Sequence, residues 1–137
     1  MDFRRLAAWV YAVVSAGAAA FQVALALGAP WGAYAMGGTF PGQFPPALRA
    51  GALVQAAVLL FFAGVVLARS GIAFRRLSRV SRWLAWVVVA FAAVSFVLNL
   101  ITPSAGERMI WAPVGLVLLV CSLLVATRHD PKGFPNL

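Results

Sequence analysis

The sequence predicts an all-α fold, an integral membrane bundle of four transmembrane helices with both termini on the cytoplasmic side. Three observations predict it: the apolar composition, the number of long uncharged stretches and the distribution of basic residues. Of the 137 residues, 64% are hydrophobic and 10% are charged, whereas soluble domains have about 45–50% apolar and about 25% charged residues. An ordinary soluble globule is therefore excluded, and the length suits a single domain over residues 1–137.

Four stretches of the chain contain no Asp, Glu, Lys or Arg and have roughly the 17–25 apolar residues that a helix needs to cross hydrocarbon. Between the third and the fourth, Pro103 stops one helix, and Ser104 followed three residues later by Glu107 forms a capping box for the next. We therefore expect a tight antiparallel hairpin there. The predicted spans are about 6–27, 50–68, 83–101 and 109–127.

The basic residues are distributed unequally between the two sides of this bundle. Basic segments stay in the cytoplasm, so the side with nine of them is predicted to be cytoplasmic and the side with two external. The arginines between the second and third spans also allow a face for anionic headgroups or an acidic partner, although fixing the topology explains them more simply. The nine are Arg4, Arg5, Arg69, Arg75, Arg76, Arg79, Arg82, Arg128 and Lys132, and the two are Arg49 and Arg108.

Two connecting segments carry further expectations. Residues 73–83 contain neither proline nor glycine, so the third helix is predicted to begin within them, before it enters the membrane. Residues 28–48 contain five glycines, four prolines and four aromatic residues but no charge, whereas a solvated linker would be more polar. We expect an ordered external loop there, lying over the helix ends as either a gate or a seal.

The composition removes most of the residues on which enzymes depend. The single cysteine, Cys121, lies in an apolar stretch, the single histidine, His129, follows the last span, and no acidic residue lies inside a span. These positions exclude thiol redox chemistry, a zinc or haem site and a hydrolase with a catalytic histidine. We expect a protein that is not an enzyme and has no cofactor or metal. Since no recognition motif accompanies the positive charge, we also expect no nucleic-acid partner.

A few polar side chains gather at one depth, near the external side of the predicted bundle. An unpaired amide in hydrocarbon is costly, and hydrogen bonds between membrane helices contribute about 0.6–2 kcal/mol each. Gln22, Gln55 and Asn99 are therefore predicted to form a hydrogen-bonded cluster, or alternatively to line a polar pocket for a solute. The candidate binding residues are Gln22, Gln55, Ser95, Asn99, Arg49, Glu107 and Arg108.

Two of the spans carry a narrow stripe of small or polar residues at helical spacing. Such stripes let membrane helices approach one another closely. In the first span the stripe is Ala8, Ala12, Ser15, Ala19, Gln22 and Ala26, and in the third it is Ala85, Val88, Ala92, Ser95 and Asn99.

Two functions from different classes follow from these features. The stripes favour a small non-catalytic structural or accessory subunit that forms a homo-oligomer or assembles with another membrane protein. The alternative is an oligomeric minimal channel or carrier for a small neutral or anionic solute, with the polar cluster as its binding site. Ten arginines to one lysine are typical of a GC-rich bacterial genome, so the lipid bilayer of a bacterial cytoplasmic membrane is the expected location.

Overall fold

The computed structural model describes residues 2–127 of the chain. Within them the fold is all-helical, and four helices are long and apolar enough to cross a membrane, as predicted. Arg128, His129 and Lys132, which entered the sequence argument, lie outside the described residues. The long helices are α1 (Phe3–Ala26), α2 (Pro46–Arg69), α3 (Ser81–Ile101) and α4 (Ala105–Thr127), and three short 3₁₀ turns are η1 (Gly32–Tyr34), η2 (Met36–Gly38) and η3 (Arg75–Leu77).

Capping residues explain why three helices begin a few residues before the apolar stretches. The Asp2 carboxylate accepts a hydrogen bond from the Arg5 N–H at 2.8 Å, and α1 begins directly after it. α2 begins at Pro46, whose fixed φ suits the first turn of a helix. α4 begins directly after Ser104, whose hydroxyl oxygen accepts from the Glu107 N–H at 3.1 Å.

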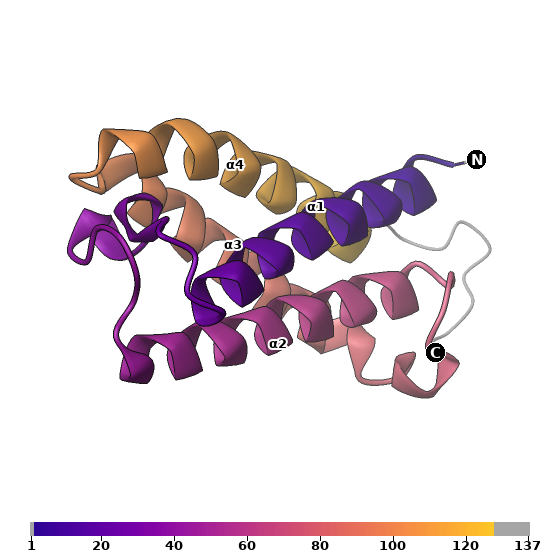
Figure 1. Ribbon diagram of the computed structural model, residues 1–137. Helices are drawn as coiled ribbons and strands as arrows, with labels where there is room; N and C mark the ends of the chain where they lie inside the picture. The colour runs from indigo at the N-terminus through magenta and orange to yellow at the C-terminus, as the bar shows by residue number, and fades with distance from the viewer. Residues whose placement is uncertain (1, 128–137) are drawn as a thin grey trace.

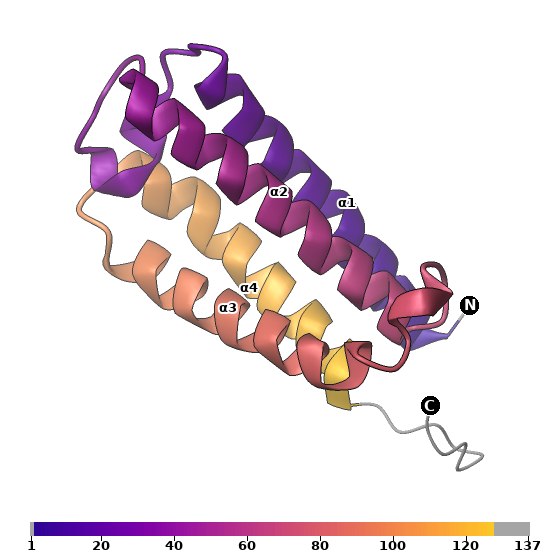
Figure 2. The same cartoon turned by 90° about the horizontal axis from the view of Figure 1, so that it is seen from below.

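The helices form two neighbouring pairs, α1 with α2 and α3 with α4 (Figure 1, Figure 2). We call the end that holds the α1–α2 loop (residues 27–45) and the α3–α4 turn (residues 102–104) the loop end. The opposite end holds the start of α1 and the α2–α3 connection, and we call it the arginine end. There the Arg4 guanidinium donates to the carbonyl oxygen of Arg69 at 2.6 Å, which ties the start of α1 to the end of α2.

The core is made mainly of small side chains and is unevenly distributed along the bundle. Near the loop end, one buried cluster contains residues of α1, α2 and their loop, and none from α3 or α4: Leu25, Ala35, Phe44 and Ala52. Toward the arginine end, all four helices contribute to a larger cluster: Ala7, Ala8, Tyr11, Ala63, Val65, Val66, Val88, Cys121 and Val125.

The predicted small-residue stripes face the inside of this bundle. Ala8 and Ser15 on α1 and Ala85 on α3 are buried against other helices of the same chain. Small residues also bring α3 close to α4, because a Cβ added to Gly115 would lie 3.2 Å from the Cα of Phe96. The stripes therefore join helices within one chain.

The third helix begins within residues 73–83, as predicted, but its extension beyond the apolar span is short. Gly71 and Phe74 adopt left-handed φ values of 78° and 57°, which interrupt a right-handed helix. The chain then forms η3, and α3 begins only at Ser81. The physical reason is the reversal of direction between α2 and α3, which requires non-helical backbone whatever the propensity of the residues.

Candidate binding site

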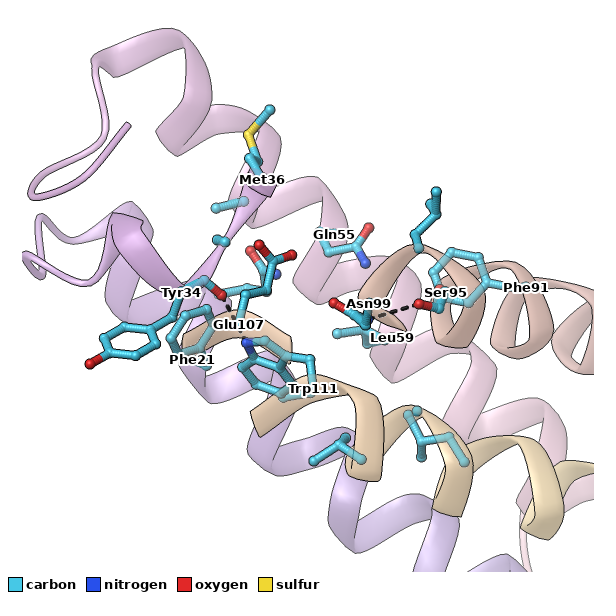
Figure 3. A pocket seen from close by; sticks show the side chains of 18 of the residues that line it. Phe21, Tyr34, Met36, Gln55, Leu59, Phe91, Ser95, Asn99, Glu107 and Trp111 are labelled. Carbon is cyan, nitrogen blue, oxygen red and sulfur yellow. Dashed lines mark hydrogen bonds between the residues drawn. The ribbon is translucent and has the colours of Figure 1, made fainter. Parts of the chain in front are cut away.

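A cavity of about 470 Å³ lies at the loop end of the bundle. All four helices and the α1–α2 loop contribute to its lining. Figure 3 shows the side chains of Gln55, Asn99 and Glu107 directed into the same space from α2, α3 and α4. The candidate residues that line this cavity are Gln22, Gln55, Ser95, Asn99 and Glu107.

The two remaining candidates do not line the cavity. The Arg49 Nε donates to the carbonyl oxygen of Phe44 at 2.7 Å. Arg108 is exposed, and its guanidinium donates to the carbonyl oxygen of Thr102 at 2.9 Å. Both arginines therefore stabilise the backbone at the loop end and do not place a positive charge inside the cavity.

The hydrogen-bonded cluster of three amides predicted from the sequence does not form. The Asn99 Nδ2 donates to the carbonyl oxygen of Ser95, one turn earlier in the same helix, at 2.8 Å. Within residues 2–127, no hydrogen bond joins Gln22, Gln55 and Asn99 to one another. All three side chains are half-buried and line the cavity. Because the three amides do not bond to one another, a molecule inside the cavity can form hydrogen bonds with them.

Glu107 connects α4 to the α1–α2 loop. Its Oε2 accepts hydrogen bonds from the Gly37 N–H at 2.7 Å and from the Thr102 hydroxyl at 3.0 Å. In the predicted capping box, this carboxylate would accept a hydrogen bond from the Ser104 N–H. In the structure, the Ser104 N–H donates to Thr102 Oγ1 at 3.3 Å. Half of the capping box therefore forms, and the other half is replaced by a bond to the loop.

Two further hydrogen bonds hold the loop against α4 and the turn before it. The Ser104 hydroxyl donates to the carbonyl oxygen of Ala33 at 2.7 Å. The Trp111 indole N–H donates to the carbonyl oxygen of Tyr34 at 2.9 Å. Because Tyr34 and its neighbours also line the cavity, these bonds fix one wall of the site.

Aromatic side chains that the sequence analysis did not single out form much of the lining. The rings of Phe21 and Trp111 meet edge-to-face at 4.8 Å, and those of Phe62 and Phe91 at 5.0 Å. Phe21, Phe91 and Trp111 all line the cavity. Each of the three is next to a polar cavity residue in the sequence or one helical turn from it. This shared depth is the signal from which the sequence could have predicted that they line the cavity.

The cavity carries a single charged group. Glu107 is the one acidic residue in its lining, and no lysine or arginine belongs to the lining. Among the described residues, no three His, Cys, Asp or Glu side chains lie together as a metal site. The arrangement thus offers hydrogen bonds and apolar contact to a ligand but no counter-charge for an anion.

Neither a protein-family model, nor a curated protein, nor a solved structure matches this chain. No relative therefore supplies a ligand or a reaction for the cavity, and its function is inferred from the residues that line it.

Proposed function

We propose that this protein is a multi-pass protein of the bacterial cytoplasmic membrane that binds a small uncharged solute in the loop-end cavity and serves as a carrier for it, without catalysing a reaction. The observation that carries the proposal is the convergence of polar side chains from all four helices on one cavity of about 470 Å³. Ligand cavities typically have about 300–1,000 Å³, and a few polar groups in a mostly apolar lining orient the ligand.

The unpaired amides support binding over a purely structural role. An amide group in apolar surroundings is costly unless it has a hydrogen-bond partner. Gln22 and Gln55 reach the cavity from two different helices without bonding to each other or to Asn99. A solute with a hydroxyl or amide group would supply those partners.

The charge of the lining supports an uncharged solute in place of the anion that the sequence had left open. An anion would meet the Glu107 carboxylate and no basic side chain. Removing an anion from water without a counter-charge is strongly unfavourable. Arg49 and Arg108, the two basic candidates, are bonded to backbone carbonyl groups outside the cavity.

The packing of the arginine end supports a carrier over an open channel. Val65, Val66, Val88 and Val125 come from three helices and are each at most 1% exposed. They belong to one core cluster with residues of α1. A solute in the cavity therefore meets closely packed side chains on that side, and the cavity lies within a single chain, so binding needs no oligomer.

The distribution of charge and apolar surface supports the proposed membrane orientation. The arginine end carries Arg4, Arg5, Arg69, Arg76, Arg79 and Arg82, whereas the loop end carries Arg49 and Arg108. The positive-inside rule then makes the arginine end cytoplasmic and the cavity external. Apolar side chains such as Val13, Val54 and Leu98 are 57–66% exposed on the outside of the bundle, as expected for contact with lipid.

The accessory-subunit hypothesis has less support, because its small-residue stripes are buried within the chain. It remains the competing outcome of a test on Asn99. We compare Asn99→Leu with the control Gln43→Leu, which makes the same kind of change at an exposed loop residue outside the cavity. The protein, held in phosphatidylcholine nanodiscs, is screened for thermal stabilisation by glycerol, urea, acetamide and 1-alkanols.

We expect at least one of these solutes to stabilise the native protein and Gln43→Leu, and to bind Asn99→Leu about tenfold more weakly, which corresponds to one lost hydrogen bond of about 1.4 kcal/mol. The ligand-free unfolding temperature and the oligomer mass of Asn99→Leu should stay close to the native values. If no uncharged solute stabilises the native protein, or if Asn99→Leu changes assembly and leaves binding intact, the accessory role is the better explanation.

A further inference from the structure

The cavity opens sideways between α2 and α3. Four residues of its lining are also exposed. Tyr34 and Met36 belong to the α1–α2 loop that lies over the cavity, whereas Gly51 on α2 and Leu98 on α3, which is 57% exposed, belong to the side of the bundle. A residue that lines a cavity and is also exposed marks a place where the cavity reaches the surface. Figure 2 shows α2 and α3 close together at the arginine end and farther apart at the loop end.

The packing of α3 explains the position of this opening. No residue of α3 beyond Ala92 is buried. The Phe62–Phe91 ring contact joins α2 to α3 at this level. Beyond it, the buried cluster at the loop end contains no residue of α3, so the two helices share no buried apolar cluster there.

The surface around this opening is apolar. Val54 on α2 is 65% exposed, and Val94 on α3 is 59% exposed. In a bundle that crosses a membrane, such residues contact lipid chains, because the lipid is the apolar solvent at that depth. The opening therefore faces lipid, and a molecule that uses it must be soluble among lipid chains.

Apart from Tyr11, the polar side chains of the cavity lie toward the loop end, and the lining deeper in the bundle is apolar. Gln55 and Asn99 lie toward the loop end of the lining, whereas Leu59, Phe91 and Leu118 lie closer to the arginine end. A molecule with one hydrogen-bonding group and an apolar body matches this gradient. A fully polar solute such as glycerol would leave the apolar part of the lining without a matching contact.

We propose that the ligand of this cavity is an uncharged amphiphile, an alkyl chain or ring that carries one hydroxyl or amide group, and that it passes between α2 and α3 directly from the membrane. The inference rests on the proposed function, for which it names the class of solute and the route. The polar group bonds to Gln55 and Asn99, and the apolar body lies against Leu59 and Phe91. The loop bonded to α4 covers the water-facing end of the same cavity.

The preference for an uncharged polar group follows from Glu107. Its carboxylate already accepts two hydrogen bonds and lies in the first turn of α4, where the helix dipole stabilises a negative charge. An ammonium group is therefore not needed to balance it, and an anionic group is repelled by it.

The test compares four probes at equal concentration with the protein in phosphatidylcholine nanodiscs: 1-decanol, decylamine, decanoate and glycerol. The measured quantity is the rise in unfolding temperature of the native protein minus the rise for Asn99→Leu, which removes effects of the probes on the lipid. We expect this difference to be largest for 1-decanol. If decylamine or decanoate gives the larger difference, the inference about the polar group is wrong.

The results separate this inference from the proposed function. If glycerol gives the difference and 1-decanol does not, the cavity binds a solute but not an amphiphile, and only the further inference fails. If no probe gives a difference and no solute of the wider panel does, both fail.

The route is tested by Leu98→Trp, which narrows the opening, against Leu100→Trp, which adds the same ring at an exposed residue of α3 outside the lining. We expect 1-decanol to bind Leu98→Trp about tenfold more slowly than Leu100→Trp, because narrowing a route lowers the rate of entry. The ligand-free unfolding temperatures of the two variants show whether each is folded. Equal rates of binding to two folded variants would overturn the lateral route.

Discussion

At the scale of single residues, Gly32 has no room for a side chain. A Cβ at this position would lie 1.9 Å from the Phe40 carbonyl oxygen and 2.7 Å from that of Gly42. The Gly32 N–H donates to the same Gly42 oxygen at 2.9 Å, so the two arms of the α1–α2 loop are in direct backbone contact. Because backbone atoms block the position, a substitution must move the loop itself.

Gly32→Ala is therefore expected to destabilise the protein by at least about 1 kcal/mol, which lowers the unfolding temperature by roughly 3–5 °C for a domain of this size. The matched control is Gly17→Ala, because a Cβ there meets nothing within 4 Å. That change lies inside α1 and should stabilise the helix by about 0.5–1 kcal/mol. Thermal unfolding followed by circular dichroism measures both, and equal unfolding temperatures would contradict the close contact.

The candidate site shows what the sequence can and cannot predict for individual side chains. The common depth of Gln22, Gln55 and Asn99 follows from their places in the spans, because a helix rises about 1.5 Å per residue. Their partners do not follow from it, since a small rotation of one helix about its axis decides whether two amides meet or face a space between them. The partner of Glu107 could not be predicted either, because Gly37 is 70 residues away in the chain.

At the scale of elements, α4 and the turn before it hold the α1–α2 loop in place. Glu107, Ser104 and Trp111 bond to the backbone of Gly37, Ala33 and Tyr34. The Glu107 bond involves a charged acceptor, and such hydrogen bonds contribute about 1.5–3 kcal/mol. The loop should therefore detach from α4 when this carboxylate is removed.

We expect Glu107→Ala to make the loop more accessible to chymotrypsin at Tyr34, which is 39% exposed in the native protein. Glu107→Gln keeps an oxygen that accepts from the Gly37 N–H, so its cleavage rate should lie between those of Glu107→Ala and the native protein. The measurement is the rate of cleavage in detergent at a temperature well below unfolding. Identical rates for all three proteins would show that the bond does not hold the loop.

The presence of the four helices was well predicted, but their exact starts depend on other residues than their apolar stretches do. Long uncharged apolar stretches identified all four, because a membrane span requires them. The exact starts depended on Asp2, Pro46 and Ser104, which lie before the apolar residues and cap the helices. The length of the non-helical connection after α2 did not follow from the sequence, because Phe74 takes a left-handed φ that its residue type disfavours.

At the scale of the whole molecule, charge and cavity lie at opposite ends. Most described arginines lie at the arginine end, and the cavity lies at the loop end. If the arginine end is cytoplasmic, the cavity and its lateral opening lie in the outer half of the membrane. The orientation therefore decides which leaflet supplies the ligand.

Single cysteines test this orientation in a background where Cys121, which is buried, is replaced by Ala. A cysteine at Thr39 in the α1–α2 loop should react with a membrane-impermeant thiol reagent in whole cells. A cysteine at Ser78 in the α2–α3 connection should react only after the cells are opened. Labelling at Ser78 alone in intact cells would reverse the proposed orientation.

The uneven core, in which all four helices join toward the arginine end while α3 leaves the common core near the loop end, has a consequence for local opening of the backbone. Amide hydrogens exchange with solvent through such openings, and these need least free energy where few apolar contacts are broken. The last two turns of α3 should thus open far more often than the helix segments around Val66 and Val125. The packed end then acts as a fixed pivot, and the molecule can change shape at one end without unfolding at the other.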